Sequence, residues 1–182
     1  MQSLLTVTRS GDMSFLWAYG ATTPDIRRQL QQFWIANGGI TDSSEAWRRS
    51  FEVGCIAVDA GGKIAGVSSF YMDRLLPAGP MYWMYRTFVR PENRRTRLAI
   101  DIFKVSVAQL THYALHERGA PVGVAAIIEN PALELPGPVA HMQQLGLERL
   151  GADQQGRSVW RRNFVMEEMP QQQADSPFPS SE

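Results

Sequence analysis

The sequence predicts an α/β or α+β fold, in which a mixed sheet is built around one right-handed β–α–β unit. Residues 81–89 are aromatic and β-branched, which is typical of a buried strand. Residues 94–116 carry apolar side chains at helical spacing. Residues 122–128 have little polarity on either face, as in a central strand that is covered on both sides. A helix between two such strands favours a parallel pair.

The composition of the chain already limits the kinds of protein and binding site that are expected. The 182 residues suffice for one domain with a real core, and 44% of them are hydrophobic. Lys+Arg and Asp+Glu both number 18, so net charge gives no reason to expect binding to nucleic acid or to a membrane surface. The single cysteine, Cys55, excludes an intrachain disulfide, and no Cys/His cluster indicates a metal site. Neither a signal peptide nor a membrane span is evident, and we therefore expect a cytoplasmic protein.

The N-terminal part is predicted as two strands followed by two helices. Residues 4–8 and 14–19 are the candidate strands. The Thr-Pro pair at residues 23–24 is a helix start, because threonine caps the helix and proline fits its first turn. A second, short helix follows, and we expect it to bury Trp47 and Phe51.

The rest of the chain is predicted to alternate strands with helices and to end in a tail. The domain is expected to span residues 1–166, because residues 167–182 are rich in Pro, Gln, Ser and acid and predict a disordered tail. The expected elements are a hairpin of residues 53–59 and 63–71, the strand of residues 81–89, a helix from Arg94 to His116, the strand of residues 122–128, a helix from Gly137 to Gly146, and a closing hairpin of residues 149–152 and 157–164.

The junction between the strand of residues 81–89 and the following helix carries a basic turn. Arg94, Arg95 and Arg97 flank Thr96 there. A helix N-terminus offers unpaired N–H groups and the positive end of the helix dipole, so it attracts phosphate. Guanidinium groups and a hydroxyl would add charge-assisted donors. The residues alone leave two interpretations open, a pyrophosphate cradle and a solvated basic turn without a ligand.

The same junction reads Val89-x-Pro91-x-x-Arg94-x-x-Arg97-x-Ala99. This spacing resembles the acetyl-CoA signature of the GNAT acetyltransferase superfamily. That signature is typically a strand that ends in Val-x-Pro, followed by Arg or Gln, two residues, Gly, one residue, and Gly or Ala. The order of elements over roughly residues 1–165 is also similar, including the hairpin before the signature strand and the strand that ends near Asn130. The matching positions here are Val89, Pro91, Arg94, Arg97 and Ala99, together with a later Leu145-Gly146-Leu147 that resembles the family's Leu-Gly-Phe.

The resemblance implies a GNAT-like mixed sheet flanked by helices, with parallel strands that splay apart at its centre. It also implies that acetyl-CoA, or another acyl-CoA, is a co-substrate, that no metal is needed, and that an amine of a small molecule or protein attacks the thioester directly. The implied cofactor contacts are the backbone of Phe88 and Val89 for the pantetheine arm, the amides of Arg94, Arg95, Thr96, Arg97, Leu98 and Ala99 for the pyrophosphate, and Asn130.

Two positions depart from the family's pattern. Arg97 stands where the family has glycine, which lets backbone approach phosphate closely. Met142 stands four residues before Gly146, where the family often has a tyrosine that protonates the departing thiolate. A thiolate of CoA is able to leave unaided, so two hypotheses remain. The first is a working N-acetyltransferase, and the second is a degenerate domain that binds acyl-CoA or a partner protein without turnover.

Few other side chains qualify as catalytic or binding groups. Glu129, at the end of the central strand, is the candidate base for an ammonium acceptor, with a solvent-exposed carboxylate as the alternative. His141 points about 100° away from Met142 on a helix and is a poor substitute acid. His112 and His116 are more simply a surface pair than a metal site, and Cys55 more simply a buried thiol than a nucleophile. A homodimer is possible, and nucleic-acid binding through the arginines is the least favoured alternative.

Overall fold

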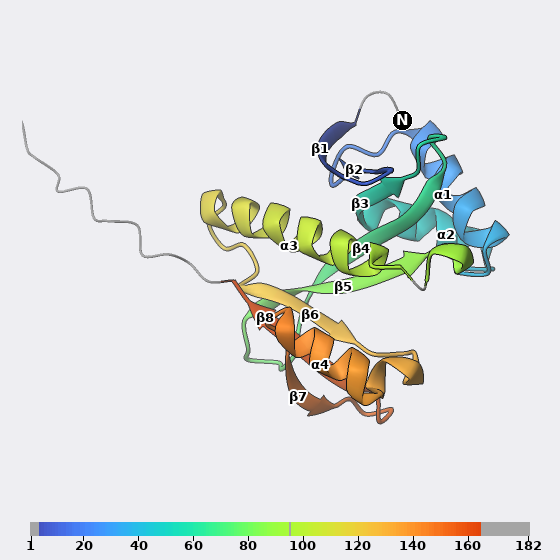
Figure 1. Ribbon diagram of the computed structural model, residues 1–182. Helices are drawn as coiled ribbons and strands as arrows, with labels where there is room; N and C mark the ends of the chain where they lie inside the picture. The colour runs from blue at the N-terminus through green and yellow to red at the C-terminus, as the bar shows by residue number, and fades with distance from the viewer. Residues whose placement is uncertain (1–3, 95, 165–182) are drawn as a thin grey trace, which may run out of the picture.

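The computed structural model describes residues 4–94 and 96–164, so the predicted domain boundary and tail lie outside the described residues. No helix in these residues is long and apolar enough to cross a membrane. Figure 1 shows the arrangement of the elements. The strands are β1 (Leu5–Ser10), β2 (Met13–Trp17), β3 (Val53–Val58), β4 (Ile64–Arg74), β5 (Met81–Val89), β6 (Gly123–Ile127), β7 (Glu148–Ala152) and β8 (Ser158–Asn163). The helices are α1 (Pro24–Ala36), α2 (Ser43–Arg49), α3 (Leu98–His116) and α4 (Pro136–Gln144), with 3-10 turns η1 (Ser50–Glu52), η2 (Pro91–Asn93) and η3 (Pro131–Glu134).

One mixed sheet joins all the described strands in the order β1-β2-β3-β4-β5-β6-β8-β7. The β5–β6 pair is parallel, and the other neighbouring pairs are antiparallel. Helix α3 connects β5 to β6, which confirms the predicted β–α–β unit at the centre of the sheet.

The two faces of the sheet are covered differently. On one face, α3 and α4 pack over the odd-numbered side chains of β5, of which Trp83 and Tyr85 are buried. On the other face, α1 lies over β2 to β4 and extends to Phe88, whose ring meets Phe33 edge-on. Beyond Phe88 that second face continues over β5 and β6 as a small apolar cluster of Tyr71, Leu75, Tyr82, Met84, Ala125 and Ile127. This uncovered half of the second face is where hollows occur.

The burial predicted for α2 is wrong. Only Ala46 of this seven-residue helix is buried, while Trp47 is 37% exposed and Phe51, in η1, is 49% exposed. Their rings pack edge-on against each other, and the guanidinium of Arg27 lies 3.7 Å from the centre of the Phe51 ring. A helix this short covers too little of the sheet to bury two large aromatic side chains.

Helix α3 begins later than the pattern predicted. The amphipathic pattern started near Arg94, whereas the first residue of α3 is Leu98. Residues 91–93 form the turn η2 instead, as proline allows. The Thr96 hydroxyl then donates to the carbonyl of Asn93 at 2.7 Å and accepts the N–H of Leu98 at 3.2 Å. These two hydrogen bonds of Thr96 stabilise the turn that leads into α3.

Gly123, the first residue of β6, is required for close strand pairing. A Cβ there would lie 2.2 Å from the carbonyl oxygen of Arg162, in the neighbouring strand β8. We expect Gly123→Ala to destabilise the protein by about 1–3 kcal/mol or more, as overpacking does. Gly137→Ala is the matched control, because its Cβ would meet nothing within 4 Å. Urea denaturation compares the two variants, and equal stabilities would contradict this account of β6.

Candidate functional site

The site begins where β5 and β6 separate. Their register contains Trp83 opposite Val124 and Met84 opposite Ala125, and the pairing ends there. Beyond this point β5 pairs only with β4, as far as Val89 opposite Gly66, while β6 pairs only with β8. The predicted splay of the two parallel strands is therefore confirmed. A sheet that opens in this way leaves strand backbone facing a gap.

The hydrogen bonds at the two ends of β5 show which backbone groups face the gap. The N–H of Arg90 donates to Ala65, which precedes Gly66 in β4, and the carbonyl of Met81 accepts from Val122 on the β6 side. Because the N–H and C=O of successive strand residues point to alternate sides, odd-numbered residues of β5 face β6. Thr87 and Val89 thus direct their N–H groups into the gap, whereas the backbone of Phe88 faces β4.

The basic turn after β5 is partly committed to local contacts. The Nε–H of Arg94 donates to the carbonyl of Val89 at 3.2 Å, and its guanidinium lies 5.4 Å from the centre of the Phe88 ring. Arg90 is bound by Asp59 at 3.2 Å and by Glu92 at 3.0 Å. Arg94 therefore closes the end of the strand, and its charge lies beside the gap.

Arg97 directly precedes α3 and adopts φ −80° and ψ 4°. No residue other than glycine has a positive φ in the described part of the chain. Arginine at this position is therefore unstrained, and the turn does not need the conformational freedom of glycine. Arg97 and Thr96 are exposed, while Leu98 is buried and Ala99 is half-buried. Arg95 lies outside the described residues.

The end of β6 forms the other side of the gap, opposite β5. Asn130 is exposed, and its Oδ1 accepts the N–H of Ala132 at 3.1 Å, which starts η3. Glu129 is 76% exposed and lies 3.7 Å from Arg157. The carboxylate of Asp153 also holds Arg157, at 2.7 Å, and this guanidinium lowers the pKa of Asp153 below its usual value. Glu129 is thus accessible to a ligand.

The remaining candidates do not form a second site. Met142 packs against the core cluster that contains Tyr85 and Trp160. Cys55 is fully buried, and burial raises the pKa of its thiol to about 12, so it stays protonated and unreactive near neutral pH. The Nδ1 atom of His116 lies 2.7 Å from the carbonyl of His112 in the preceding turn. No group of three His, Cys, Asp or Glu side chains suited to a metal occurs within residues 4–94 and 96–164.

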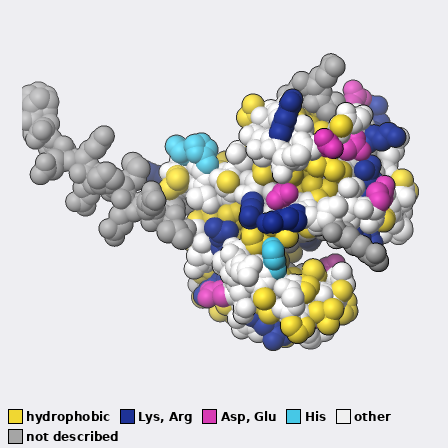
Figure 2. Space-filling view, viewed as in Figure 1, with side chains coloured by type: hydrophobic (Ala, Val, Ile, Leu, Met, Phe, Trp, Pro, Cys, Tyr) yellow, Lys and Arg dark blue, Asp and Glu magenta, His cyan; other side chains and the backbone are white. Residues whose placement is uncertain are grey.

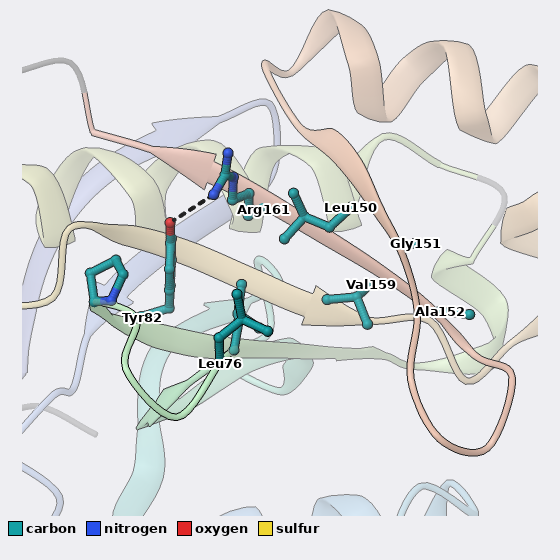
Figure 3. A pocket seen from close by; sticks show the side chains of 10 residues that line it. Leu76, Tyr82, Leu150, Gly151, Ala152, Val159 and Arg161 are labelled. Atoms are coloured by element: carbon teal, nitrogen blue, oxygen red, sulfur yellow. Dashed lines mark hydrogen bonds between the residues drawn. The ribbon is translucent and has the colours of Figure 1, made fainter.

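Two adjacent hollows lie on the uncovered half of the second face. One has a volume of about 350 Å³ and lies next to the point where the strands separate. Its lining mixes apolar side chains, such as Met84 and Ile127, with the polar or charged side chains of Asp73, Arg74, Asp153 and Gln154. The other, of about 330 Å³, lies farther along and is shown in Figure 3. There, Arg161 donates to the hydroxyl of Tyr82 at 3.5 Å and closes one side. In Figure 2 the surface is notched between the lobe that carries α4 and the rest of the domain.

The sequence interpretation missed the residues that surround the gap on this second face. Arg86 is the one charged residue in the strand Met81–Val89. A charge in an otherwise apolar central strand is a signal that could have identified it. Its partners, Glu52 and Tyr71, come from other elements and have no such signal in the sequence.

Comparisons with known proteins give the fold. No family model matches the sequence, and no curated protein does. A putative acetyltransferase from Acinetobacter baylyi superposes with a TM-score of 0.62 at 16% identity, covering 92% of this chain and 99% of that one. A ribosomal-protein-S5-alanine acetyltransferase from Vibrio fischeri gives 0.62 at 9% identity, over 88% and 97%. A GNAT phosphinothricin acetyltransferase from Sinorhizobium meliloti, in complex with acetyl-CoA, gives 0.59 at 16% identity, over 84% and 89%. The chain therefore has the GNAT fold, as the junction motif indicated.

Proposed function

We propose that this chain is an N-acetyltransferase that moves an acetyl group from acetyl-CoA, or another acyl group from its CoA ester, to an amine. The observation that carries the proposal is the gap between β5 and β6, which opens beside the basic turn of residues 94–97. The gap-facing backbone of Thr87 and Val89 suits the amides of a pantetheine arm, because a strand edge without a partner strand accepts an extended polar chain.

The phosphates belong at the turn before α3. The positive charges of Arg94 and Arg97, together with the positive end of the α3 dipole, would attract the pyrophosphate. Arg94 would act from the end of β5, where it holds the carbonyl of Val89. Asn130 would contact the pantetheine arm from the β6 side of the gap, since its amide –NH₂ is a further donor near the end of β6.

Acetyl-CoA would supply an activated thioester, and the protein would supply position and charge. The amine must approach from the second face, because α3 and α4 cover the first. It attacks as the neutral amine, its nitrogen bonds to the acetyl carbon, and the C–S bond breaks to release a thiolate, while the second proton of the nitrogen passes to water. Glu129 lies on the β6 side of the gap. We assign it to accept the proton of the acceptor's ammonium group, directly or through water.

The structural neighbours include one enzyme named for a small molecule and one named for a ribosomal protein, and both acceptor classes fall within this proposal. A binding domain without turnover is the second candidate, and Met142 is the observation that favours it. Methionine has no proton to give to a departing thiolate.

Thiol release tests the proposal. With acetyl-CoA and a panel of amines, we expect CoA to appear faster than in the absence of acceptor, in proportion to enzyme concentration. Glu129→Gln is expected to lower kcat by about 10²-fold or more at neutral pH, if its carboxylate takes the proton. Tight binding of acetyl-CoA without thiol release on any amine would favour the second candidate instead.

A further inference from the structure

Arg86 lies on β5 at the mouth of the gap, on the face from which an acceptor would approach. On this face of β5, Arg86 lies between Met84 and Phe88, and both of these residues contact other apolar groups. The Arg86 side chain remains 32% exposed. Thr87, the first residue whose N–H faces the open gap, is its direct neighbour in the chain. A cation is thus held beside the place where the acceptor must bind.

Among the described residues, the ion pairs around Arg86 contain more guanidinium groups than carboxylates. Glu52 binds Arg86 at 3.1 Å and Arg48 at 2.5 Å. Glu45 binds Arg48 at 2.8 Å and Arg49 at 3.0 Å. Three guanidinium groups therefore share two carboxylates. A cluster with this balance attracts an anion.

Arg86 keeps spare hydrogen-bonding capacity, as does Arg49 on α2, which within the described residues bonds only through Nη2, to Glu45. Arg48 uses Nε, Nη1 and Nη2 on the two carboxylates. Arg86 uses only Nη1, on Glu52, within the described part of the chain. Its Nε–H and Nη2 groups have no protein acceptor there. A guanidinium presents such donors as a planar fork, which matches the two oxygens of a carboxylate.

Two contacts fix the orientation of this fork. The Glu52 ion pair holds one end, and the ring of Tyr71 lies beneath the guanidinium, with Cζ 4.3 Å from the ring centre. Glu52 is itself only 16% exposed, so the pair is shielded from solvent more than most surface ion pairs. A donor that is oriented in advance loses little conformational entropy when it binds a ligand.

A hollow with a mixed polar and apolar lining adjoins the fork. Tyr71 forms part of the wall of the 350 Å³ hollow, together with Met84 and Ile127. Glu129 follows shortly after Ile127 at the end of β6, across the gap from Arg86. A ligand with its carboxylate on Arg86 would therefore have its amine beside the gap, near a carboxylate that favours an ammonium.

We propose that the acceptor is a small amine that also carries a carboxylate, such as an amino acid, and that Arg86 binds this carboxylate. The inference rests on the proposed acetyl transfer and adds the chemical class of the acceptor. Arg86 is then a specificity-determining residue, and Glu52 and Tyr71 are positioning residues that hold its fork.

Pairs of acceptors that differ only in the carboxylate test the inference. L-methionine is compared with 3-(methylthio)propylamine, and L-phenylalanine with phenethylamine, by kcat/KM for thiol release. The wild-type protein should prefer the carboxylated member of each pair by about 10- to 100-fold, as expected for hydrogen bonds to a charged group. Arg86→Gln should remove this preference by lowering kcat/KM for the amino acids alone. Arg86→Lys should retain part of it, because lysine keeps the charge but not the fork.

Arg28→Gln is the control, because Arg28 is an exposed arginine on α1 that lies 3.0 Å from Asp25 and lines neither hollow. It should change neither member of a pair by more than about threefold. In parallel, L-methionine is titrated calorimetrically into the wild-type protein saturated with CoA, which detects binding even without turnover.

The possible outcomes separate the two proposals. If the amines without a carboxylate react as well as the amino acids, acetyl transfer stands and the assignment of Arg86 is overturned. If Arg86→Gln slows both members of each pair equally, Arg86 is only structural. If no amine of either kind releases thiol and L-methionine does not bind the CoA complex, the acceptor inference falls. The proposed function then falls with it if acetyl-CoA does not bind either.

Discussion

Thr87→Pro is expected to weaken acetyl-CoA binding by about 10- to 100-fold, because it deletes an N–H that would bond to a carbonyl of the pantetheine arm. Proline removes this donor without removing a backbone hydrogen bond between β5 and β4, since the Thr87 N–H faces the gap and not β4. It also removes the hydroxyl that donates to Val67 in β4. Proline is accepted at such positions, where the N–H side of a strand has no partner strand. Calorimetric titration of acetyl-CoA into the variant measures the change in Kd.

Two further variants separate the loss of the Thr87 N–H from the other effects of the proline substitution. Thr87→Val removes the hydroxyl, which donates to the carbonyl of Val67 at 3.2 Å, and keeps the N–H. It should leave the Kd for acetyl-CoA within about threefold, at a stability cost of about 1 kcal/mol. Phe88→Pro should unfold the protein or lower its melting temperature strongly, because that N–H faces β4. Unchanged acetyl-CoA binding by a folded Thr87→Pro protein would contradict the assignment of this edge to the pantetheine arm.

Met142→Tyr is expected to raise kcat by about 10- to 100-fold, because a phenol at this position on α4 would protonate the departing thiolate. Met142 is half-buried and packs against the core cluster that contains Tyr85, a residue of β5 next to the point where β5 and β6 separate. The larger ring is expected to cost about 1–3 kcal/mol of stability through overpacking. The comparison of kcat with KM is informative, because an acid that acts only on the leaving group changes kcat and leaves acetyl-CoA affinity unchanged.

His141→Tyr provides the control for this gain. It adds the same phenol to the same turn of α4, about 100° around the helix from Met142. Its kcat should equal that of the wild-type protein. If the two tyrosine variants behave alike, or if a folded Met142→Tyr protein is no faster than wild type, then α4 does not face the leaving group.

Much of the fold could be predicted because its signals are local. Proline at position 24, the glycines after α1 and α4, and the low polarity of β6 mark element ends and a buried strand without reference to the rest of the chain. The start of α3 was placed too early, because the pattern of apolar residues does not reveal that the Thr96 hydroxyl bonds to the backbone of Asn93 and Leu98.

The candidate site could be predicted only in part, because half of it depends on contacts between distant elements. The motif from Val89 to Ala99 located the junction, and the strand order located the gap. Which amides of β5 face the gap follows from a bond between Arg90 and Ala65, which no pattern within β5 specifies. Arg86 gains its role from Glu52 in η1 and Tyr71 in β4, residues 34 and 15 positions away along the chain.

The exposure of Trp47 and Phe51 illustrates the same limit for burial. Their spacing suits a helix face that is buried, but burial depends on what the helix packs against. Helix α2 lies at the end of α1, where Gln31 bonds to Ser43, and only Ala46 reaches the core. Local sequence specified the helix and its cap at Asp42, while the tertiary arrangement decided which face was covered.

Calorimetric titration of the unmodified protein with acetyl-CoA tests the central claim most directly, since both the acceptor class and the catalytic roles depend on a CoA site between β5 and β6. We expect one site per chain with a Kd in the range of about 1 µM to 1 mM, as for enzyme substrates in general. Free CoA should compete for that site, because it shares the pantetheine arm and the pyrophosphate. Absence of heat and of any thermal shift at millimolar acetyl-CoA would contradict the account.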